Sequence, residues 1–579
     1  MPAIHPLLTG VRFRRFAPSV WDAAVFALVV GALVLVAVGG RETLQPLAAS
    51  QRTPISLDPW NLPHYALRTT LRMLAAIVAS TVFTFLYGTW AAKSRRAEMV
   101  LIPLLDILQS IPVLGFMTFT LAFFLALFPG QVLGAEFASI FLIFTAQAWN
   151  MTFSFYQSLK TVPRDLSDVS NSLRLGPWRR FWTLEAPFAA PGLIWNAMLS
   201  MSGAWFFVVA GEVFSVGKTT VLLPGVGSYV QVAIDHRDLR AVGYAVLTML
   251  LVILAYDQLL FRPLVAWSNK FRVELSAGSG PPARSWLLDF FQRAQLVRRL
   301  TRPIGRLNQA MMRLRLGRAP QPPAMVAKAW SSRTADWLWL ALIALVALAA
   351  AAGAIGYVGA EVSPLEAAGV FGLGAITLLR VLVLIALASL LWVPVGVWVG
   401  LHPRWSAVVQ PLAQFAAAFP SNILFPLVVV VIVRFHLVPD IWLSPLMILG
   451  TQWYILFNVI AGASAFPNDL REAAASLQLR GWIWWRKVIL PGIAPYYVTG
   501  AITASGGSWN ASIVAEVASW GHDKVEAHGL GAYIADATGK GDMPRVILGV
   551  VIMSVFVVAF NRALWRPLFE FASRRLRLD

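Results

Sequence analysis

Long apolar runs recur along the whole chain of 579 residues, and they constrain its fold more than any other feature. An α-helix rises about 1.5 Å per residue, so roughly 20 apolar residues can cross the roughly 30 Å of hydrocarbon in a bilayer. The runs lie near residues 23–40, 66–92, 100–127, 131–150, 190–214 and 241–261, and then near 337–358, 372–400, 407–433, 440–463, 493–518 and 546–565. The sequence therefore predicts an all-α polytopic membrane protein with about twelve transmembrane helices.

Composition agrees with lipid as the main solvent, because 58% of the residues are hydrophobic and 13% are charged, against about 25% charged in an average soluble domain. The net charge of +19 does not indicate nucleic-acid binding, since the basic residues stand in short runs between apolar stretches. The first run carries 18 uncharged residues, more than the roughly 7 to 15 of a signal peptide. We expect it to be an uncleaved first helix.

Positive charge in short loops predicts the orientation, because Lys and Arg are retained on the cytoplasmic side. Basic residues gather near 12–15, 93–96, 160–180 and 471–487 and in the tail at 574–577, whereas the loop after the seventh span has Glu361 and Glu366 and no Lys or Arg. Both termini are therefore predicted to be cytoplasmic.

The second six spans repeat the first six. Shifting the sequence by 308 residues superposes Pro112 on Pro420, and shifting it by 304 superposes Trp205 on Trp509. Many Trp, Pro, Gly and charged residues match in order at these nearly equal offsets, which indicates two homologous six-helix halves. Each half has an even number of spans, so both share one orientation and can form a pseudo-two-fold pair.

The repeat divides the chain into a first membrane domain (1–265), a basic linker (266–335) and a second membrane domain (336–579). The linker holds 13 Lys and Arg residues against Glu274 and Asp289. Its apolar residues cluster around Trp286, beside basic ones. Either an amphipathic helix on anionic headgroups or a solvated linker fits this pattern.

The most informative pattern is in the loop between the fourth and fifth spans of the second half, residues 464–491. A short helix is expected there, with Asp469 as its cap and Glu472 near its positive end. Apolar residues follow at i, i+3, i+4 and i+7, namely Leu470, Ala473, Ala474 and Leu477. The helix is too short to span a membrane, so its apolar stripe is expected to dock on another surface.

This loop resembles the signature of ABC importer permeases, through Glu472, Ala473, Ala474, Gly481 and Ile489-Leu490-Pro491. The first half departs from that signature, with Asp168-Val169-Ser170, Gly176 and Glu185-Ala186-Pro187, but it keeps an apolar stripe of Leu166, Val169 and Leu173 and has Asp165 where the second half has Asp469. The resemblance implies that both loops hold coupling helices gripped by ATPase subunits. The alternative is a pair of ordinary interfacial helices.

Two further segments narrow the resemblance. Residues 205–212 with 225–230, and 509–516 with 529–534, look like the nitrate, sulfonate, taurine and bicarbonate branch of these permeases. This implies a fused, duplicated permease of a bacterial inner membrane. It would import a small anion delivered by an extracytoplasmic binding protein.

Charged residues near the outer ends of spans form a separate set of candidates. Carboxylates close to lipid are costly and usually pair or face water. The set comprises Glu212, Glu516, Arg72 and Arg380, with Trp205 and Trp509 in the same motifs. These residues either line the solute pathway, where the arginines would attract an anion, or form a buried brace.

No catalytic or nucleotide-binding set is recognisable in the sequence. Gly217-Lys218-Thr219 mimics a phosphate-binding loop, but five residues separate Gly211 from Gly217 where Walker A has four. The histidines lack metal-ligand spacing, and no Ser/His/Asp or Cys/His set is present. We therefore expect no enzyme activity, cofactor or metal in this chain, with ATP and Mg²⁺ bound by a partner ATPase.

The leading interpretation is thus the permease of an ATP-driven importer. Its expected partners are two ABC ATPase subunits, a binding protein and the lipid bilayer, and no nucleic acid. A secondary transporter of the major facilitator class is the main alternative, because it also has two six-span halves and a basic central linker. It does not explain the paired loops at 160–187 and 464–491.

Overall fold

The computed structural model describes residues 55–216, 219–271, 285–293, 330–466, 468–521 and 523–575, with the single residues Gly31, Pro46 and Pro303. Within these ranges eight helices are long and apolar enough to cross a membrane, and three bent helix pairs raise the count to as many as eleven spans. They coincide with the predicted spans from 66–92 to 546–565. The predicted first span, 23–40, and most of the linker lie outside the described residues.

The first half is built from five described spans. They are α3 (Leu62–Phe83) continuing into α4 (Thr89–Lys93); α5 (Arg95–Ser110) with α6 (Met117–Leu127); α7 (Val132–Lys160); α9 (Pro177–Arg180) leading into α10 (Ala186–Ala210); and α12 (Leu239–Tyr256) leading into α13 (Arg262–Ser268). The short helix α8 (Arg164–Ser172) precedes α9, and a hairpin of β1 (Val213–Val216) and β2 (Thr219–Leu222) precedes α11 (Val226–Asp235). In the linker, α14 (Trp286–Arg293) occupies the segment expected to be an amphipathic helix.

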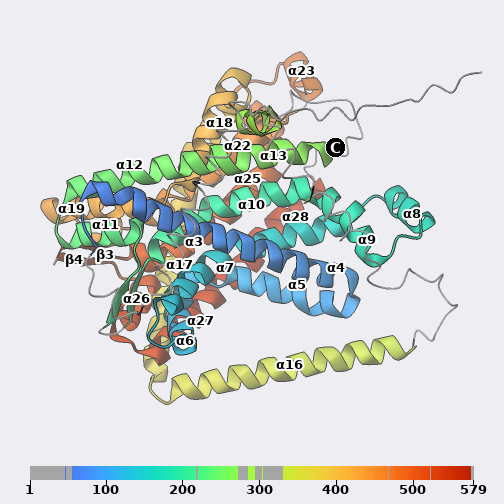
Figure 1. Ribbon diagram of the computed structural model, residues 1–579. Helices are drawn as coiled ribbons and strands as arrows, with labels where there is room; N and C mark the ends of the chain where they lie inside the picture. Colours follow the sequence, from blue (N-terminus) through green and yellow to red (C-terminus); the bar gives the residue numbers. More distant parts are fainter. Residues whose placement is uncertain are drawn as a thin grey trace, which may run out of the picture.

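The second half has the same order of elements after an additional described span. The elements are α16 (Trp330–Gly359), α17 (Pro364–Gly400), α18 (Pro403–Ala418), α19 (Phe425–Phe435), α20 (Pro439–Trp442), α21 (Leu446–Leu449), α22 (Gln452–Ser464), α23 (Asn468–Ser476), α24 (Gly481–Trp484), α25 (Leu490–Ala515), β3 (Val517–Trp520), β4 (Asp523–Glu526), α26 (Leu530–Lys540), α27 (Met543–Phe560) and α28 (Arg566–Arg575). The helix α16 lies along one edge of the molecule and meets the rest near α27 (Figure 1).

The repeat read from the sequence is visible element by element. Helices α8 and α23 begin at 164 and 468, and strands β1 and β3 begin at 213 and 517, an offset of 304 in each case. Helices α6 and α19 begin at 117 and 425, an offset of 308. Even the π-helical turns recur, at Phe181–Glu185 and Trp485–Ile489. The duplication therefore extends to local irregularities of the backbone.

Proline explains why the third span of each half is broken. The chain leaves helical geometry at Ile111 and Phe419, each followed by a proline that restricts it to an extended conformation. The resulting bends are 94° and 77°. Beyond each bend the chain meets the fifth span of the other half: Val113 N donates to Asn510 Oδ1 at 2.6 Å. The breaks thus bring the two halves together at the centre of the molecule.

Small residues let the spans approach closely, as is usual where lipid weakens the hydrophobic drive between helices. A Cβ added to Gly400 on α17 would lie 2.6 Å from the Cβ of Ala463 on α22. One added to Gly500 on α25 would lie 2.7 Å from the Tyr454 carbonyl oxygen, also on α22. These contacts hold the second and fifth spans of the second half against its fourth span.

Candidate functional site

The two short helices α8 and α23 project from the body of the molecule, and α8 lies at the end opposite β3 and β4 (Figure 1). Their apolar residues are largely uncovered. Leu173 and Leu477, which are related by the repeat, are 66% and 72% exposed. Val169, Leu470 and Ala473 are exposed as well. No other part of the described chain covers these apolar residues. The sequence predicts such an exposed stripe for a surface that docks on a partner.

One position of the stripe faces the other way. Ala474 is only 4% exposed, and Ser170 at the equivalent place on α8 is buried too. Ala474 is therefore not part of the exposed face, because this side of α23 packs against the rest of the chain. The polar residues Asp165, Asp168 and Glu472 are exposed.

Both short helices end in the same left-handed turn. Arg174 and Gln478 have φ values of 48° and 51°, and their backbone N–H groups donate to the carbonyls of Asn171 and Ala475. Gly481 then has φ of 59°, which favours glycine. At the offset of 304 residues Gly481 corresponds to Pro177, and the motif glycine of the first half, Gly176, has φ of −63° and needs no glycine for conformation.

The expected cap of α23 is not where the sequence suggested. The helix begins at Asn468, so Asp469 lies in the first turn and Glu472 one turn further along. The side chain of Asp469 lies outside the described set. At the equivalent place on α8 the cap is Pro163, without a side-chain hydrogen bond. The positive end of the helix dipole still stabilises the acidic side chains near the helix start.

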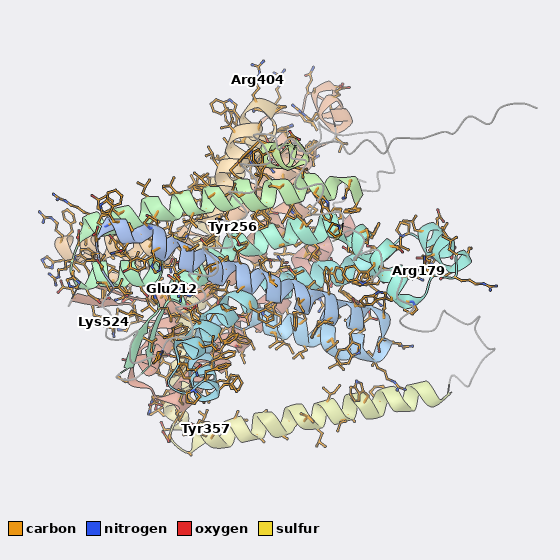
Figure 2. All side chains as sticks on the ribbon, in the orientation of Figure 1. Arg179, Glu212, Tyr256, Tyr357, Arg404 and Lys524 are labelled. Atoms are coloured by element: carbon orange, nitrogen blue, oxygen red, sulfur yellow. The ribbon has the colours of Figure 1, made fainter. Side chains whose placement is uncertain are left out.

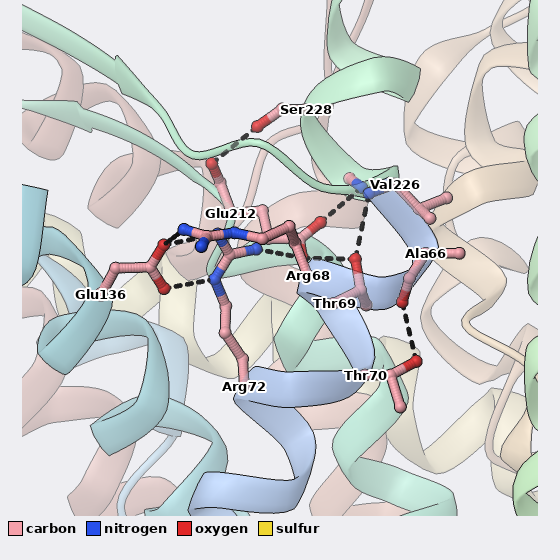
Figure 3. A network of polar contacts seen from close by, with 10 residues as sticks. Ala66, Arg68, Thr69, Thr70, Arg72, Glu136, Glu212, Val226 and Ser228 are labelled. Atoms are coloured by element: carbon pink, nitrogen blue, oxygen red, sulfur yellow. Dashed lines mark hydrogen bonds and ion pairs between the residues drawn. The ribbon is translucent and has the colours of Figure 1, made fainter. Parts of the chain in front are cut away.

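A buried ionic cluster joins three elements of the first half (Figure 3). Arg72 on α3 donates to both oxygens of Glu136 on α7, at 2.6 and 2.8 Å, and to Oε1 of Glu212 at 2.7 Å. Arg68 adds a second bond to Glu136 at 2.6 Å, and the Thr69 hydroxyl donates to Glu212 at 2.6 Å. Arg72 is 2% exposed and Glu212 is 0% exposed, so the carboxylates are paired with cations away from solvent.

Glycines make room for the Glu212 carboxylate. A Cβ on Gly225 would lie 2.2 Å from the carboxyl carbon of Glu212, and the backbone N–H of Gly227 donates to Oε2 of Glu212 at 2.6 Å. In the second half a Cβ on Gly529 would lie 2.3 Å from the carboxyl carbon of Glu516. The Gly-x-Gly part of each motif is thus explained by close approach of backbone to a buried carboxylate.

The second half repeats this cluster in a more open form. Arg380 donates to Asp440 at 2.6 Å and to Glu516 at 3.2 Å, and the Thr377 hydroxyl donates to Glu516 at 2.9 Å. Asp440 is 38% exposed, and the backbone N–H of His528 donates to it at 2.7 Å. Glu136 of the first half is enclosed, whereas Asp440, its counterpart in the second half, reaches the surface.

Of the two uses predicted for these charges, the geometry fits the brace. Each arginine bonds to two carboxylates from other elements, and Figure 2 shows Glu212 inside the molecule, unlike Arg179 and Arg404 at its projecting parts. Trp205 packs edge-on against Tyr256, with ring centroids 5.5 Å apart. Trp509 borders a cavity at the centre of the molecule.

That cavity lies between the halves and has a volume of about 400 Å³. The fourth and fifth spans of both halves line it, together with the breaks at Val113 and Ser421 and the end of α27. Among the described residues that line it there is no Asp, Glu, Lys, Arg or His. Their polar groups are amides and hydroxyls, chiefly Asn150, Asn196, Ser200, Thr451, Tyr454, Asn458, Thr503 and Asn510.

Sequence reasoning missed these lining residues. A usable signal was present, because uncharged polar side chains within apolar spans are costly unless they are paired or face water. Asn150 donates to Ser200 at 3.1 Å, which links α7 to α10 beside the cavity. The sequence gives no indication that the residues of both halves surround one space. In the described part of the chain no group of three or more His, Cys, Asp or Glu could hold a metal ion.

Comparison with known families identifies the repeated unit. The model of the family "Binding-protein-dependent transport system inner membrane component" matches residues 84–260 and again residues 392–564. Each match falls within one membrane domain. The two matched regions contain α8 and α23, the buried carboxylates Glu212 and Glu516, and most residues of the cavity.

Curated relatives are similar over about a third of the chain. The bicarbonate transport system permease protein of Synechococcus elongatus is 29% identical over 194 residues, which is 34% of this chain and 66% of the relative. The nitrate import permease protein of Leptolyngbya laminosa is 26% identical over 193 residues, 33% of this chain and 66% of the relative. The glycine betaine/carnitine transport permease protein of Listeria monocytogenes is 25% identical over 209 residues, again 66% of the relative. The alignments therefore span just under two thirds of these relatives.

Proposed function

Because the chain belongs to the family of binding-protein-dependent transport system inner membrane components and carries its domain twice, we propose that it forms both membrane domains of an ATP-driven importer. Membership in this family sets aside the major facilitator alternative. In the proposed assembly one ATPase subunit binds α8 and a second binds α23. An extracytoplasmic binding protein delivers the solute at the opposite face, and both termini of the chain lie in the cytoplasm.

The observation that supports this proposal best is the pair of exposed apolar stripes on α8 and α23. Leu173 and Leu477 occupy equivalent places, and both are left uncovered by the chain itself. Exposed apolar side chains that lie next to one another on one helix face, as Leu470 and Leu477 do, are typical of a surface that a partner covers. Two equivalent surfaces fit two equivalent partners, and hydrolysis of ATP would take place in those partners.

The proposed solute is a small anion such as bicarbonate or nitrate, because relatives of this chain carry those names. It would pass through the central cavity between the halves. Amide and hydroxyl donors such as those of Asn150 and Tyr454 can hydrogen-bond an oxyanion. Because the described lining residues include no lysine or arginine, selection of the anion would be left to the binding protein.

The uncharged lining also favours a second candidate. A zwitterionic solute carries no net charge, so the cavity need not compensate an excess charge, and hydrogen-bond donors and aromatic faces in the lining can contact its two charged groups. The volume of about 400 Å³ lies within the range of roughly 300–1,000 Å³ of pockets that take organic ligands. A betaine-like solute therefore fits the same cavity, as the name of the Listeria relative suggests.

Transport by the reconstituted complex tests both candidates. The chain is placed in proteoliposomes with candidate ATPase and binding-protein subunits from the same organism, and uptake of labelled bicarbonate, nitrate and glycine betaine is compared. Uptake should need ATP and the binding protein. Uptake driven by an ion gradient in the absence of ATP would contradict the proposal.

A further inference from the structure

The short helix α8 is tied to the membrane spans by charged groups. Arg180, at the end of α9, donates through Nη1 to Asn171 Oδ1 at 3.2 Å and through Nη2 to Ser167 Oγ at 3.4 Å. Both acceptors lie on α8. The Nε of the same arginine donates to Glu185 Oε1 at 3.0 Å. One guanidinium therefore connects α8 to the start of the fifth span.

Glu185 receives a second cation from another span. The Nζ of Lys93, the last residue of α4, lies 2.7 Å from Glu185 Oε2, an ion pair without hydrogen-bond alignment. The side chain of Glu185 is 9% exposed, whereas those of Lys93 and Arg180 are 38% and 27% exposed. A largely buried carboxylate thus holds together the end of the second span, the start of the fifth span and, through Arg180, the helix α8.

The second half makes the same connection without charge. At the positions equivalent to Lys93, Arg180 and Glu185 it has Leu401, Trp484 and Ile489. Ile489 is buried. Phe466, just before α23, packs onto Gly492, where an added Cβ would lie 2.3 Å from its ring. The attachment of α23 is therefore apolar packing.

The fifth span links these attachments to the cavity. Helix α10 follows directly after Glu185, and it carries Asn196, Leu199 and Ser200 in the cavity lining. Helix α25 carries Thr503, the repeat equivalent of Leu199, in the same lining. A displacement of α8 or α23 would reach the cavity through these two spans.

We propose that Glu185 is a positioning residue that transmits movement of α8 to the second and fifth spans, so that the first half is coupled through charges and the second half through packing. This inference rests on the proposed function, in which an ATPase moves α8. Replacing Glu185 by glutamine leaves Lys93 and Arg180 as two neighbouring cations without their carboxylate. Replacing all three by Leu, Trp and Ile reproduces the apolar solution of the other half.

Cysteine accessibility tests the inference without knowledge of the solute. The chain has no cysteine, so Leu199→Cys and Thr503→Cys each provide a single thiol in the cavity, one per half. The complex with its ATPase partners is treated with N-ethylmaleimide, with and without ATP plus vanadate. In the parent chain we expect both labelling rates to change with nucleotide, by about tenfold for a two-state shift of population.

In the Glu185→Gln background the response at Leu199→Cys should fall below about twofold, while the response at Thr503→Cys is retained. The triple replacement Lys93→Leu, Arg180→Trp and Glu185→Ile should restore the first response. Ile489→Val is the matched control in the second half and should change neither response.

The possible failures are distinguishable. Unchanged responses in Glu185→Gln, with the ATPase still bound, would overturn the role of Glu185. Equal loss at both reporters without rescue by the triple replacement would also overturn it, because Glu185 would then be a general structural residue. A parent chain that bound no ATPase would overturn the proposed function itself.

Discussion

Replacing Arg72 by methionine should destabilise the protein more than the equivalent replacement of Arg380. Methionine keeps much of the side-chain volume and removes the charge. In the first half it takes three hydrogen bonds away from Glu136 and Glu212. Glu136 keeps Arg68 at 2.6 Å, but Glu212 is left with no cation in the described cluster.

The magnitude follows from burial. Removing one partner of a buried ion pair costs about 3–5 kcal/mol, because the remaining charge stays buried without compensation. Arg380→Met should cost less, about 2–3 kcal/mol. Its partner Asp440 is 38% exposed and keeps His528. The buried Glu516 loses a cation that lies 3.2 Å away, against 2.7 Å between Arg72 and Glu212. The double variant Arg72→Met/Glu212→Gln should recover part of the loss, because it neutralises the unpaired carboxylate.

The assay is the half-life of the folded monomer in detergent at a fixed elevated temperature, measured by size-exclusion chromatography, because large membrane proteins rarely unfold reversibly. A loss of 3 kcal/mol or more in the barrier to unfolding shortens the half-life by at least about 100-fold. If Arg72→Met were as stable as the parent but imported the solute with weaker apparent affinity, Arg72 would belong to the pathway and the brace would be refuted.

Three further predictions concern the glycines, the docking stripe and ATP. Gly225→Ala should destabilise the protein about as much as Arg72→Met, because the added Cβ would meet the Glu212 carboxylate. The control Gly243→Ala places its Cβ in open space and should be tolerated in the same half-life assay. Leu477→Asp should abolish co-purification of the ATPase while the chain still inserts and elutes as a monomer, because it places a charge at the proposed contact; normal co-purification would contradict docking at α23. The purified chain alone should hydrolyse no ATP in a phosphate-release assay, and tight nucleotide binding by it would contradict a separate ATPase.

The spans and the repeat were predictable because both can be found in the sequence without knowledge of contacts in the fold. Hydropathy depends on each run by itself, and the repeat depends on matched residues at a fixed offset. Pro112 and Pro420 were found in that way, and the structure shows that each breaks a span. The same comparison would have paired Glu136 with Asp440, since they too are 304 residues apart.

The clusters and the cavity could not be predicted because they depend on contacts across the fold. Arg72 and Glu136 are 64 residues apart, and neither residue type indicates its partner. The burial of Ala474 depends on how α23 rests on its own chain, which a helical periodicity does not specify. The cavity depends on both bends at once. Sequence periodicity identifies the face of a helix but not the surface that the face meets.

Fusion of the two halves gives a reason for the differences between them. Two separate copies of one permease domain would present identical residues to the cavity, so any polar group introduced on one side would appear on both. In a single chain the repeat positions differ: Asn150 corresponds to Tyr454, and Phe206 corresponds to Asn510. The contacts between the halves differ as well. Asn510 accepts from the Val113 backbone at 2.6 Å, whereas the Phe206 carbonyl accepts from the Asn422 side chain at 3.3 Å.

The two halves also differ in how α8 and α23 are attached to the membrane spans. A carboxylate and two cations connect α8 to its spans, and apolar packing connects α23. Charged contacts weaken with salt and with loss of one partner, whereas packing contacts respond to volume. Equal movements of two ATPases would therefore meet unequal resistance in the two halves. Raising the salt concentration at the face that carries α8 and α23 should lower the nucleotide response of the Leu199→Cys reporter before that of Thr503→Cys. An equal decline at both reporters would show that the two halves respond as one unit.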